Sequence, residues 1–452
     1  MIEPPLRAFP PGPAARTDGV IAALRYFYGF YTDPIGFVRG RFDRYGDVYY
    51  VPNAGGGLFV LRHPDHLKEV LVTRAASFGK AHSAFRHLSS FLGDGLLTTE
   101  GEIWKRQRRI VQPAFATTRL AGYARTMVEE SRVTTDRFRD GATIDAGHEM
   151  MDLTLRIVAR TLFGHDVAGE TKSVARAMAA FQESIESVGQ LLPEWIPTPN
   201  RKRSREGLAT IDRIIYAMIA RARGEKGDSA TPNLLSILVS AVDVEGDGRG
   251  LDEREVRDQL VTLFLAGHET TSHALTWTLY LLSQNPRAQA KLFEELDRVL
   301  AGRAATYDDL PTLPYTEQVV EEAMRLYPPV YSLARAAKED TVIGGYPVPK
   351  GSEVVLWIYM TQRDERWFEA PTEFRPERFA EPTAIPKFAY LPFGGGSRAC
   401  IGKSFAMLEA RLALATLLQK HRLELAPDQR VDVKPRITLC PKYGMKMLVR
   451  AR

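Results

Sequence analysis

The sequence predicts a mainly helical protein with small antiparallel β-sheets towards its two ends, an α+β fold. Apolar residues recur at helical spacing over 64–327 and again over 401–420. Runs of alternating or Gly-rich character occur near 46–63, 341–358 and 431–450 and predict the strands. No succession of strand, helix and parallel strand appears, which excludes a doubly wound nucleotide-binding domain.

The strand predictions rest on local patterns. The run GDVYYVPNAGGGLFVLRH alternates apolar and polar residues around a Gly-rich turn and predicts a β-hairpin over 46–63. The run TVIGGYPVPKGSEVVLWI at 341–358 is a second strand-rich segment. We expect the tail at 431–450 to form a final hairpin.

The longest predicted helix has clear signals at both ends. Asp252 and Glu255 form a D-x-x-E start signal, and Asn285 with Pro286 forms a stop signal. At 1.5 Å per residue this helix is roughly 45–50 Å long, so its middle must be buried. That middle reads LAGHETTSH, and polar residues in a buried helix need partners or a purpose.

Composition sets outer limits on fold and location. The 452 residues include 60 Lys and Arg against 55 Asp and Glu, and 44% are hydrophobic, which excludes disordered, collagen-like and coiled-coil chains. The two cysteines, Cys400 and Cys440, cannot form a disulfide framework and suit a reducing compartment. Prolines interrupt the N-terminus, and no apolar run approaches the ~20 residues of a membrane span. We expect a cytoplasmic protein whose residues 1–452 form one domain.

The polar middle of the long helix permits two chemical interpretations. His268, Glu269 and His273 resemble the helix of a zinc peptidase, but the histidines are five residues apart and so lie on different faces. The other interpretation is a notch of small residues, Ala266 and Gly267, beside Thr270, with Glu269 and Thr270 lining a path for protons. Close packing with a helix kink explains the same residues equally well at this point.

A Gly-rich loop carries the first cysteine. In FGGGSRACIGK, which begins at Phe393, three glycines permit a tight bend before Cys400, and a helix is expected to begin directly afterwards. The helix N-terminus and Arg398 both favour the thiolate form. A buried inert cysteine is the alternative. A rigidly held thiolate is what a haem iron needs as its axial ligand.

A charged cluster is expected to be structural. Glu322 and Arg325 are three residues apart on one helical face, and the segment FRPERF at 374–379 adds Arg378. A buried cluster of one carboxylate and two guanidiniums would be a structural clamp.

Together these motifs resemble the cytochrome P-450 superfamily, in its bacterial form. Phe393, Gly396, Arg398, Cys400 and Gly402 form F-x-x-G-x-R-x-C-x-G, similar to its haem-binding loop. AGHETT at 266–271 resembles its oxygen-activating helix, and E-x-x-R followed by PERF at 376–379 resembles its structural clamp. WKRQR at 104–108 resembles its W-x-x-x-R element. The motifs occur in the family's order from about Asp33 onwards.

The resemblance implies a haem-thiolate monooxygenase that inserts one oxygen atom of O₂ into a lipophilic molecule. Haem b would lie between the long helix and the cysteine loop, with Cys400 as axial ligand and Phe393 packed against the loop. Glu269 and Thr270 would deliver protons, and Ala266 with Gly267 would make room for oxygen. The residues implied for the haem propionates are Trp104, Arg108, Arg335, Arg398 and Lys80. Peroxide-using relatives replace the acid–Thr pair, so its retention here implies that O₂ and electrons are used.

The resemblance implies only a class of substrate and a type of electron donor. Fatty acids, terpenoids and steroids all remain open as substrates, because the implied pocket residues are mainly apolar: Phe85, Leu88, Phe91, Phe181, Val188, Leu263, Val330, Leu333 and Leu439. Lys105, Arg106 and Arg109, with Lys403, predict a basic face for an acidic ferredoxin or flavodoxin served by its NAD(P)H reductase. Neither nucleic acid nor a membrane span is expected, and a monomer is. A haem-thiolate sensor that does not turn over is the alternative function.

Overall fold

The computed structural model describes residues 8–13, 28–30, 32–52, 56–80, 83–164, 173, 176–177, 180–181, 183–184, 196, 198–224, 233–243, 246 and 248–452. The chain forms two compact units. Unit 1 comprises Met1–Ser83, Met324–Phe374 and Glu381–Cys400, and unit 2 comprises Ala84–Ala323, Arg375–Ala380 and Ile401–Arg452. Within the described ranges, no helix combines the length and the apolar character that crossing a membrane requires.

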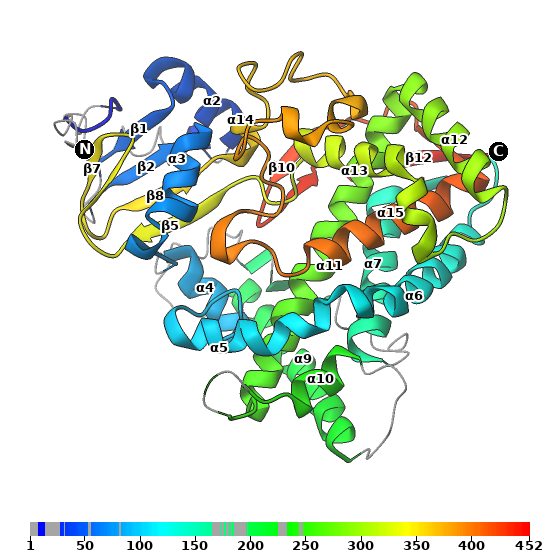
Figure 1. The fold of residues 1–452 in the computed structure, drawn as a ribbon, viewed down its shortest axis with the longest axis horizontal. Coiled ribbons are helices and arrows are strands. Elements are labelled where there is room, and N and C mark those ends of the chain that lie inside the picture. The colour runs from blue at the N-terminus through cyan, green and yellow to red at the C-terminus, as the bar shows by residue number, and fades with distance from the viewer. Residues whose placement is uncertain are drawn as a thin grey trace. The chain divides into compact units, whose positions relative to one another are not determined.

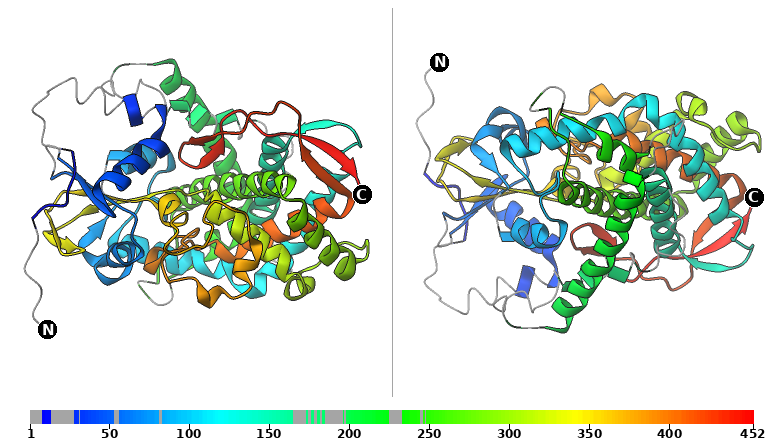
Figure 2. Two further views of the ribbon diagram at one scale, coloured as in Figure 1. Left: turned by 90° about the horizontal axis from the view of Figure 1, so that it is seen from above. Right: turned by 90° about the horizontal axis from the view of Figure 1, so that it is seen from below.

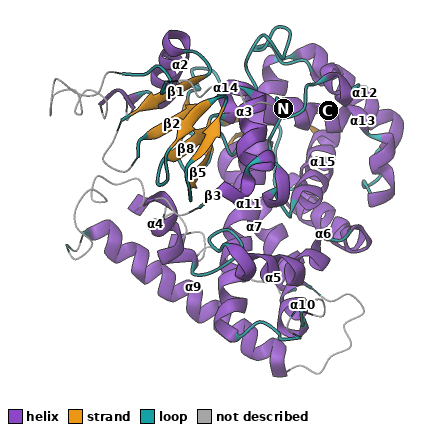
Figure 3. Ribbon diagram, turned by 60° about the vertical axis from the view of Figure 1, so that its left-hand side comes forward, coloured by secondary structure: helices purple, strands orange, loops and turns teal. Residues whose placement is uncertain are grey.

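Unit 1 is built on a five-stranded sheet of order β1-β2-β8-β5-β3 (Figure 3). The predicted hairpin is confirmed, because β1 and β2 pair antiparallel, and β2 continues into the sheet by parallel pairing with β8. Short helices and a π-helical turn, η1, accompany the sheet. The elements are β1 (Val48–Val51), β2 (Leu58–Leu61), β3 (Phe78–Gly79), β5 (Leu333–Ala337), β8 (Glu353–Leu356), α2 (Pro34–Tyr45), α3 (Pro64–Lys68), η1 (Glu69–Thr73) and α14 (Ile358–Thr361).

The strand prediction at 341–358 is confirmed, and one further strand precedes this segment. It contains the hairpin of β6 (Thr341–Ile343) and β7 (Tyr346–Val348), followed by β8. Strand β5, with the sequence LARAA, was missed because it has little intrinsic strand preference. It is a strand because it pairs with β8 on one side and β3 on the other.

Unit 2 holds most of the helices, and α11 is the longest described (Figure 1). The predicted ends of α11 are confirmed: Asp252 forms a capping box with Glu255, and Asn285 ends the helix. Helix α11 packs against α7, α9 and α15, and α15 also packs against α6. The helices are α4 (Ser83–Leu92), α5 (Gly101–Val111), α6 (Thr117–Thr135), α7 (Ala146–Phe163), α9 (Pro199–Gly224), α10 (Leu234–Ser240), α11 (Glu253–Gln284), α12 (Pro286–Leu300), α13 (Pro314–Leu326), which continues into unit 1, and α15 (Lys403–Lys420).

The C-terminal strands pair differently from the prediction. The tail does not form one hairpin: β10 (Val433–Pro435) pairs with β11 (Leu439–Pro441), whereas β12 (Lys446–Ala451) pairs with β9 (His421–Leu425) and β4 (Thr143–Asp145) (Figure 2). The partners of β12 were not foreseen because short strands far apart in the chain leave no local signal of pairing. The turn between β10 and β11 brings Thr438 against α11.

A carboxyl group lies in the core of unit 2. Glu409 on α15 is 0% exposed and is surrounded by Leu408, Ala410 and Leu412 in sequence. Burial raises its pKa well above the usual value, and the Thr271 hydroxyl of α11 offsets only part of this effect. Glu409 is therefore neutral over a pH range in which an exposed glutamate is ionised.

This burial makes the stability of the protein depend on pH. The pKa of Glu409 is higher in the folded state than its ordinary value of 4.5, so unfolding releases a proton above that pH. The contribution of Glu409 protonation to the free energy of unfolding is fully present below about pH 4.5. It decreases as pH rises, by about 1.4 kcal/mol per pH unit for one proton. In Glu409→Gln this contribution is absent. Denaturant unfolding between pH 5 and 7 should therefore show wild type losing stability relative to Glu409→Gln.

The matched control is Glu294→Gln, at an exposed position of α12. Its unfolding free energy should run parallel to that of wild type over the same pH range. A constant difference between wild type and Glu409→Gln at every pH would contradict the raised pKa.

Candidate functional site

The cysteine loop of unit 1 is a tight bend closed by a backbone hydrogen bond. The Cys400 amide donates to the Phe393 carbonyl at 2.9 Å. Gly394 and Gly396 both have φ of +68°. A Cβ at Gly396 would lie 2.0 Å from the carbonyl oxygen of Leu71 in η1, so only glycine fits there. The loop therefore holds Cys400 at an exposed position, and α15 begins three residues later at Lys403.

Three predicted cationic residues belong to the same unit. Arg335 lies on β5, and Arg398 lies in the short turn before Cys400, both half-buried. Lys80 is 7% exposed and directly follows β3. Because Gly79 pairs with Ala336, the antiparallel register places the Lys80 backbone level with Arg335. The pairing of β3 with β5 thus brings two residues together that are 255 positions apart in the sequence.

Helix α11 of unit 2 has an accessible stripe in its otherwise buried middle. Ala266 is exposed and Gly267 and Thr270 are half-buried, whereas residues 256–265 and 271–279 are all buried. The Thr270 hydroxyl donates to the Ala266 carbonyl at 2.7 Å. A Cβ at Gly267 would lie 3.3 Å from Val158, so glycine also permits the close approach of α7. The helix is continuous here and is not broken by the notch.

The acid of this helix is buried and hydrogen-bonded. Glu269 is 3% exposed, and its Oε1 accepts a hydrogen bond of 2.5 Å from the Thr438 hydroxyl. The same hydroxyl lies 3.0 Å from His273 Nδ1. The other histidine of the motif, His268, bonds the Phe264 carbonyl at 2.7 Å through Nδ1.

These contacts exclude the zinc-peptidase interpretation. His268 and His273 bond different partners, and burial lowers their pKa values to about 4 and about 3, so both are neutral. Over the described part of the chain, no three or more His, Cys, Asp or Glu side chains cluster so as to hold a metal ion. The histidines serve the packing and hydrogen bonding of α11 instead.

Helix α5 presents the W-x-x-x-R pair. Trp104 and Arg108 share one face and are both half-buried, and the Arg108 guanidinium lies 5.7 Å from the centre of the Trp104 ring. The two side chains thus form a small cation–aromatic pair on this face.

The basic face predicted for the same helix is not observed. Lys105 pairs with Glu102 at 2.7 Å, Arg106 with Glu255 at 2.7 Å, and Arg109 with Asp243 at 2.6 Å. Each cation of the prediction on α5 is therefore balanced by a carboxylate of unit 2. The sequence pattern misled because the partners of Arg106 and Arg109 lie more than 130 residues away.

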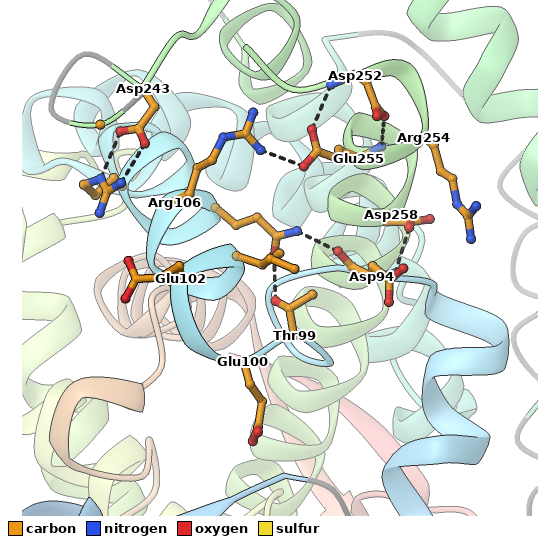
Figure 4. Close-up of a pocket in the computed structure, with 14 residues that line it drawn as sticks. Asp94, Thr99, Glu100, Glu102, Arg106, Asp243, Asp252, Arg254, Glu255 and Asp258 are labelled. Carbon is orange, nitrogen blue, oxygen red and sulfur yellow. Dashed lines mark hydrogen bonds and ion pairs between the residues drawn. The ribbon is translucent and has the colours of Figure 1, made fainter. Parts of the chain in front are cut away.

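Except for Lys105, these side chains line a cavity of about 790 Å³ (Figure 4). The carboxylates along the cavity outnumber the guanidiniums. The side chains drawn there are also hydrogen-bonded to their neighbours: Gln107 accepts from the Thr99 hydroxyl and donates to the Asp94 carbonyl. None of the predicted substrate residues lines it. Most of its lining residues are charged or polar, unlike the apolar residues predicted for the substrate.

The predicted apolar residues occur in both units. Phe91 and Phe181 stack with ring centres 3.7 Å apart and are both 3% exposed. Leu263 and Leu439 are also buried, whereas Phe85, Leu88, Val330 and Leu333 are half-buried. Val188 lies outside the described residues.

The clamp residues make charge-assisted bonds within each unit. In unit 2, Glu322 is 0% exposed and its Oε1 accepts from the Arg378 Nε at 3.0 Å and from the Arg375 amide at 2.9 Å. In unit 1, Arg325 donates to the carbonyls of Gln362, Pro371 and Glu373. These bonds tie irregular segments of chain to the end of α13.

Two residues near the candidate site were missed from the sequence. Glu409 had a usable signal, since it is the sole acid in the apolar run FAMLEARLALATLL. Thr438 had none, because an isolated threonine in a strand-rich tail is ordinary.

Similarity to known proteins extends over nearly the whole chain. The sequence profile of the family Cytochrome P450 matches residues 30–449. Cyclooctatin synthase of Streptomyces melanosporofaciens is 36% identical, covering 87% of both chains. Putative cytochrome P450 132 of Mycobacterium bovis is 35% identical over 92% of both chains, and pentalenene oxygenase of Streptomyces avermitilis is 33% identical over 96% of both. With a profile match over nearly its whole length, the chain belongs to the cytochrome P450 family and is a cytochrome P450 oxidoreductase.

Proposed function

We propose that this protein is a haem-thiolate monooxygenase that uses O₂ and electrons to oxidise a terpenoid, with residues 1–452 working as one haem domain. The observation that carries the proposal is the exposed residue Cys400, held by a loop in which glycine is required at Gly396. A sulfur donor held in this way fits an iron ligand, and the cations Arg335, Arg398 and Lys80 of the same unit fit carboxylates such as haem propionates.

The remaining contacts to haem b would come from Trp104 and Arg108, whose side chains share one face of α5. Phe393 would shield the sulfur, because the hydrogen bond from the Cys400 amide to the Phe393 carbonyl keeps the two residues close together. A haem with a thiolate axial ligand supplies the redox chemistry that cleaves molecular oxygen. Glu322, Arg325 and Arg378 would keep the surrounding chain in place.

The protons would be handled by α11. Ala266 has only a methyl side chain and Gly267 has none, so the helix surface beside Thr270 stays accessible. The Thr270 hydroxyl now donates to a carbonyl one turn back, and rotation about χ1 would free this proton for a reacting group. Glu269 would then supply a new proton to the Thr270 hydroxyl, because the carboxyl group of the neighbouring residue is a suitable proton source.

The terpenoid class is favoured by the relatives. Their names include cyclooctatin synthase, pentalenene oxygenase and cyclooctat-9-en-7-ol 5-monooxygenase, the last at 32% identity over 94% of this chain. The half-buried apolar side chains Phe85, Leu88, Val330 and Leu333 would suit such a hydrocarbon skeleton, and Leu263, Phe91, Phe181 and Leu439 would support them.

The electrons would come from a separate acidic ferredoxin or flavodoxin and its NAD(P)H reductase, in the cytoplasm. The cations of α5 are engaged in ion pairs, so they are poor docking groups. Lys105 and Lys403 are the exposed members of the predicted basic face, and the donor would dock around Lys403, which is close in sequence to the cysteine loop.

Replacing the sulfur tests the central assignment. Cys400→Ser should abolish the strongly red-shifted Soret band of the reduced carbonyl complex, because only thiolate ligation produces that shift. Cys440→Ser is the matched control: Cys440 is buried on β11 and should leave the band unchanged. Persistence of the red-shifted band in Cys400→Ser would show that another residue binds the iron.

Replacing the hydroxyl tests the proton path. Thr270→Ala should lower the product formed per NAD(P)H consumed by about tenfold or more, with hydrogen peroxide replacing product, because one proton-transfer group is lost. Thr278→Ala is the control, since Thr278 makes the same 2.7 Å bond to a carbonyl one turn back. If Thr270→Ala kept wild-type coupling, α11 would not deliver protons in the way proposed.

Titration with candidate ligands tests the substrate class. Cyclic terpenes should shift the haem spin state at micromolar concentration, and fatty acids and steroids of similar size should do so at concentrations at least about tenfold higher, a difference of ~1.4 kcal/mol in binding. Difference spectra measured over one panel of all three classes decide this. Tighter binding of a fatty acid or steroid would overturn the terpenoid assignment.

A further inference from the structure

Three side chains along one face of α11 are hydrogen-bonded to a two-residue segment of the C-terminal hairpin. Glu269 and His273 both contact the Thr438 hydroxyl, and the Trp277 indole N–H donates to the Leu439 carbonyl at 2.9 Å. The three helix positions are spaced by four, so they lie on one face. All five groups are buried and belong to unit 2.

The protons in this cluster can be placed from simple chemistry. The Thr438 hydroxyl donates its proton to the hydrogen bond with Glu269 Oε1, at 2.5 Å. The Thr438 oxygen can then only accept at His273, and Nδ1 must carry the single hydrogen of the imidazole. Burial lowers the pKa of His273 to about 3, which keeps the ring neutral and limits it to that one N–H.

The chain of bonds therefore runs in one direction, from His273 through Thr438 to Glu269. A hydroxyl that both accepts and donates has no freedom to rotate, and its donated bond to the carboxylate is strengthened by the bond it receives. Thr438 is itself held by the turn, since its carbonyl accepts from the Arg436 amide at 2.9 Å.

We propose that Thr438 is a positioning residue for oxygen activation, which holds the Glu269 carboxylate through its hydroxyl while His273 orients that hydroxyl. The inference rests on the proposed role of Glu269 and extends it to the C-terminal hairpin. Trp277 binds the same segment through the Leu439 carbonyl but does not hydrogen-bond Glu269. A Trp277 variant therefore distinguishes an effect on Glu269 from a general loosening of the segment.

The test compares Thr438→Val, Thr438→Ser and Trp277→Phe in the haem-loaded enzyme. Thr438→Val should lower the product formed per NAD(P)H by about tenfold, because Glu269 loses its orienting donor. Thr438→Ser should restore coupling to within about twofold, since it keeps the hydroxyl. Trp277→Phe should lower the unfolding midpoint and leave coupling unchanged.

A second measurement is independent of turnover. In the ferric resting enzyme, the infrared bands of Glu269 are identified by their loss in Glu269→Gln. They should shift in Thr438→Val, stay in place in Trp277→Phe and return in Thr438→Ser. If Thr438→Val fails to load haem, Thr438→Ala removes the same hydroxyl with less demand on packing.

The outcomes separate this inference from the function on which it rests. Wild-type coupling in both Glu269→Gln and Thr270→Ala would remove the proposed proton path. Uncoupling in those two variants with wild-type coupling in Thr438→Val would overturn the positioning role alone. Unshifted Glu269 bands in Thr438→Val, or equal uncoupling in Trp277→Phe, would likewise overturn it in favour of simple anchoring.

Discussion

The burial of α11 is the constraint on which unit 2 depends. A 32-residue helix that is buried through its middle loses stability for each polar group left without a partner, because an unmet buried group costs ~1–3 kcal/mol. Most of its hydroxyls bond carbonyls one turn back on the same helix, as Thr276 and Thr278 do. Glu269, His273 and Trp277 reach outside the helix instead, and the 438–439 segment meets them.

The C-terminal strands are arranged so that this segment can reach α11. Strand β12 is held between β9 and β4, and the Ala146 amide at the start of α7 donates to the Met445 carbonyl. The short β10–β11 hairpin directly precedes β12 in the chain. Because β12 is held in the sheet, the position of the hairpin turn is restrained as well. Sheet pairing at the end of the chain thus determines which atoms face the middle of a helix that begins almost 200 residues earlier.

Local signals in the sequence were sufficient for the features that are local in structure. The capping box at Asp252, the β1–β2 hairpin and the cysteine loop each depend on residues within a few positions of one another. The contact of Thr438 with Glu269 joins residues 169 positions apart, and the ion pair of Arg109 with Asp243 spans 134. No periodicity records such contacts, so the basic face of α5 was predicted wrongly and Thr438 was missed.

The two residues proposed for proton handling differ in environment although they are neighbours in the chain. Successive helix positions are about 100° apart. Thr270 therefore lies on the accessible stripe with Ala266, whereas Glu269 lies on the face bonded to Thr438. In the proposed path the bond from Thr438 restricts the rotamers of Glu269, so less conformational entropy is lost at each proton transfer, and this is how the C-terminal hairpin would contribute to the chemistry of Thr270.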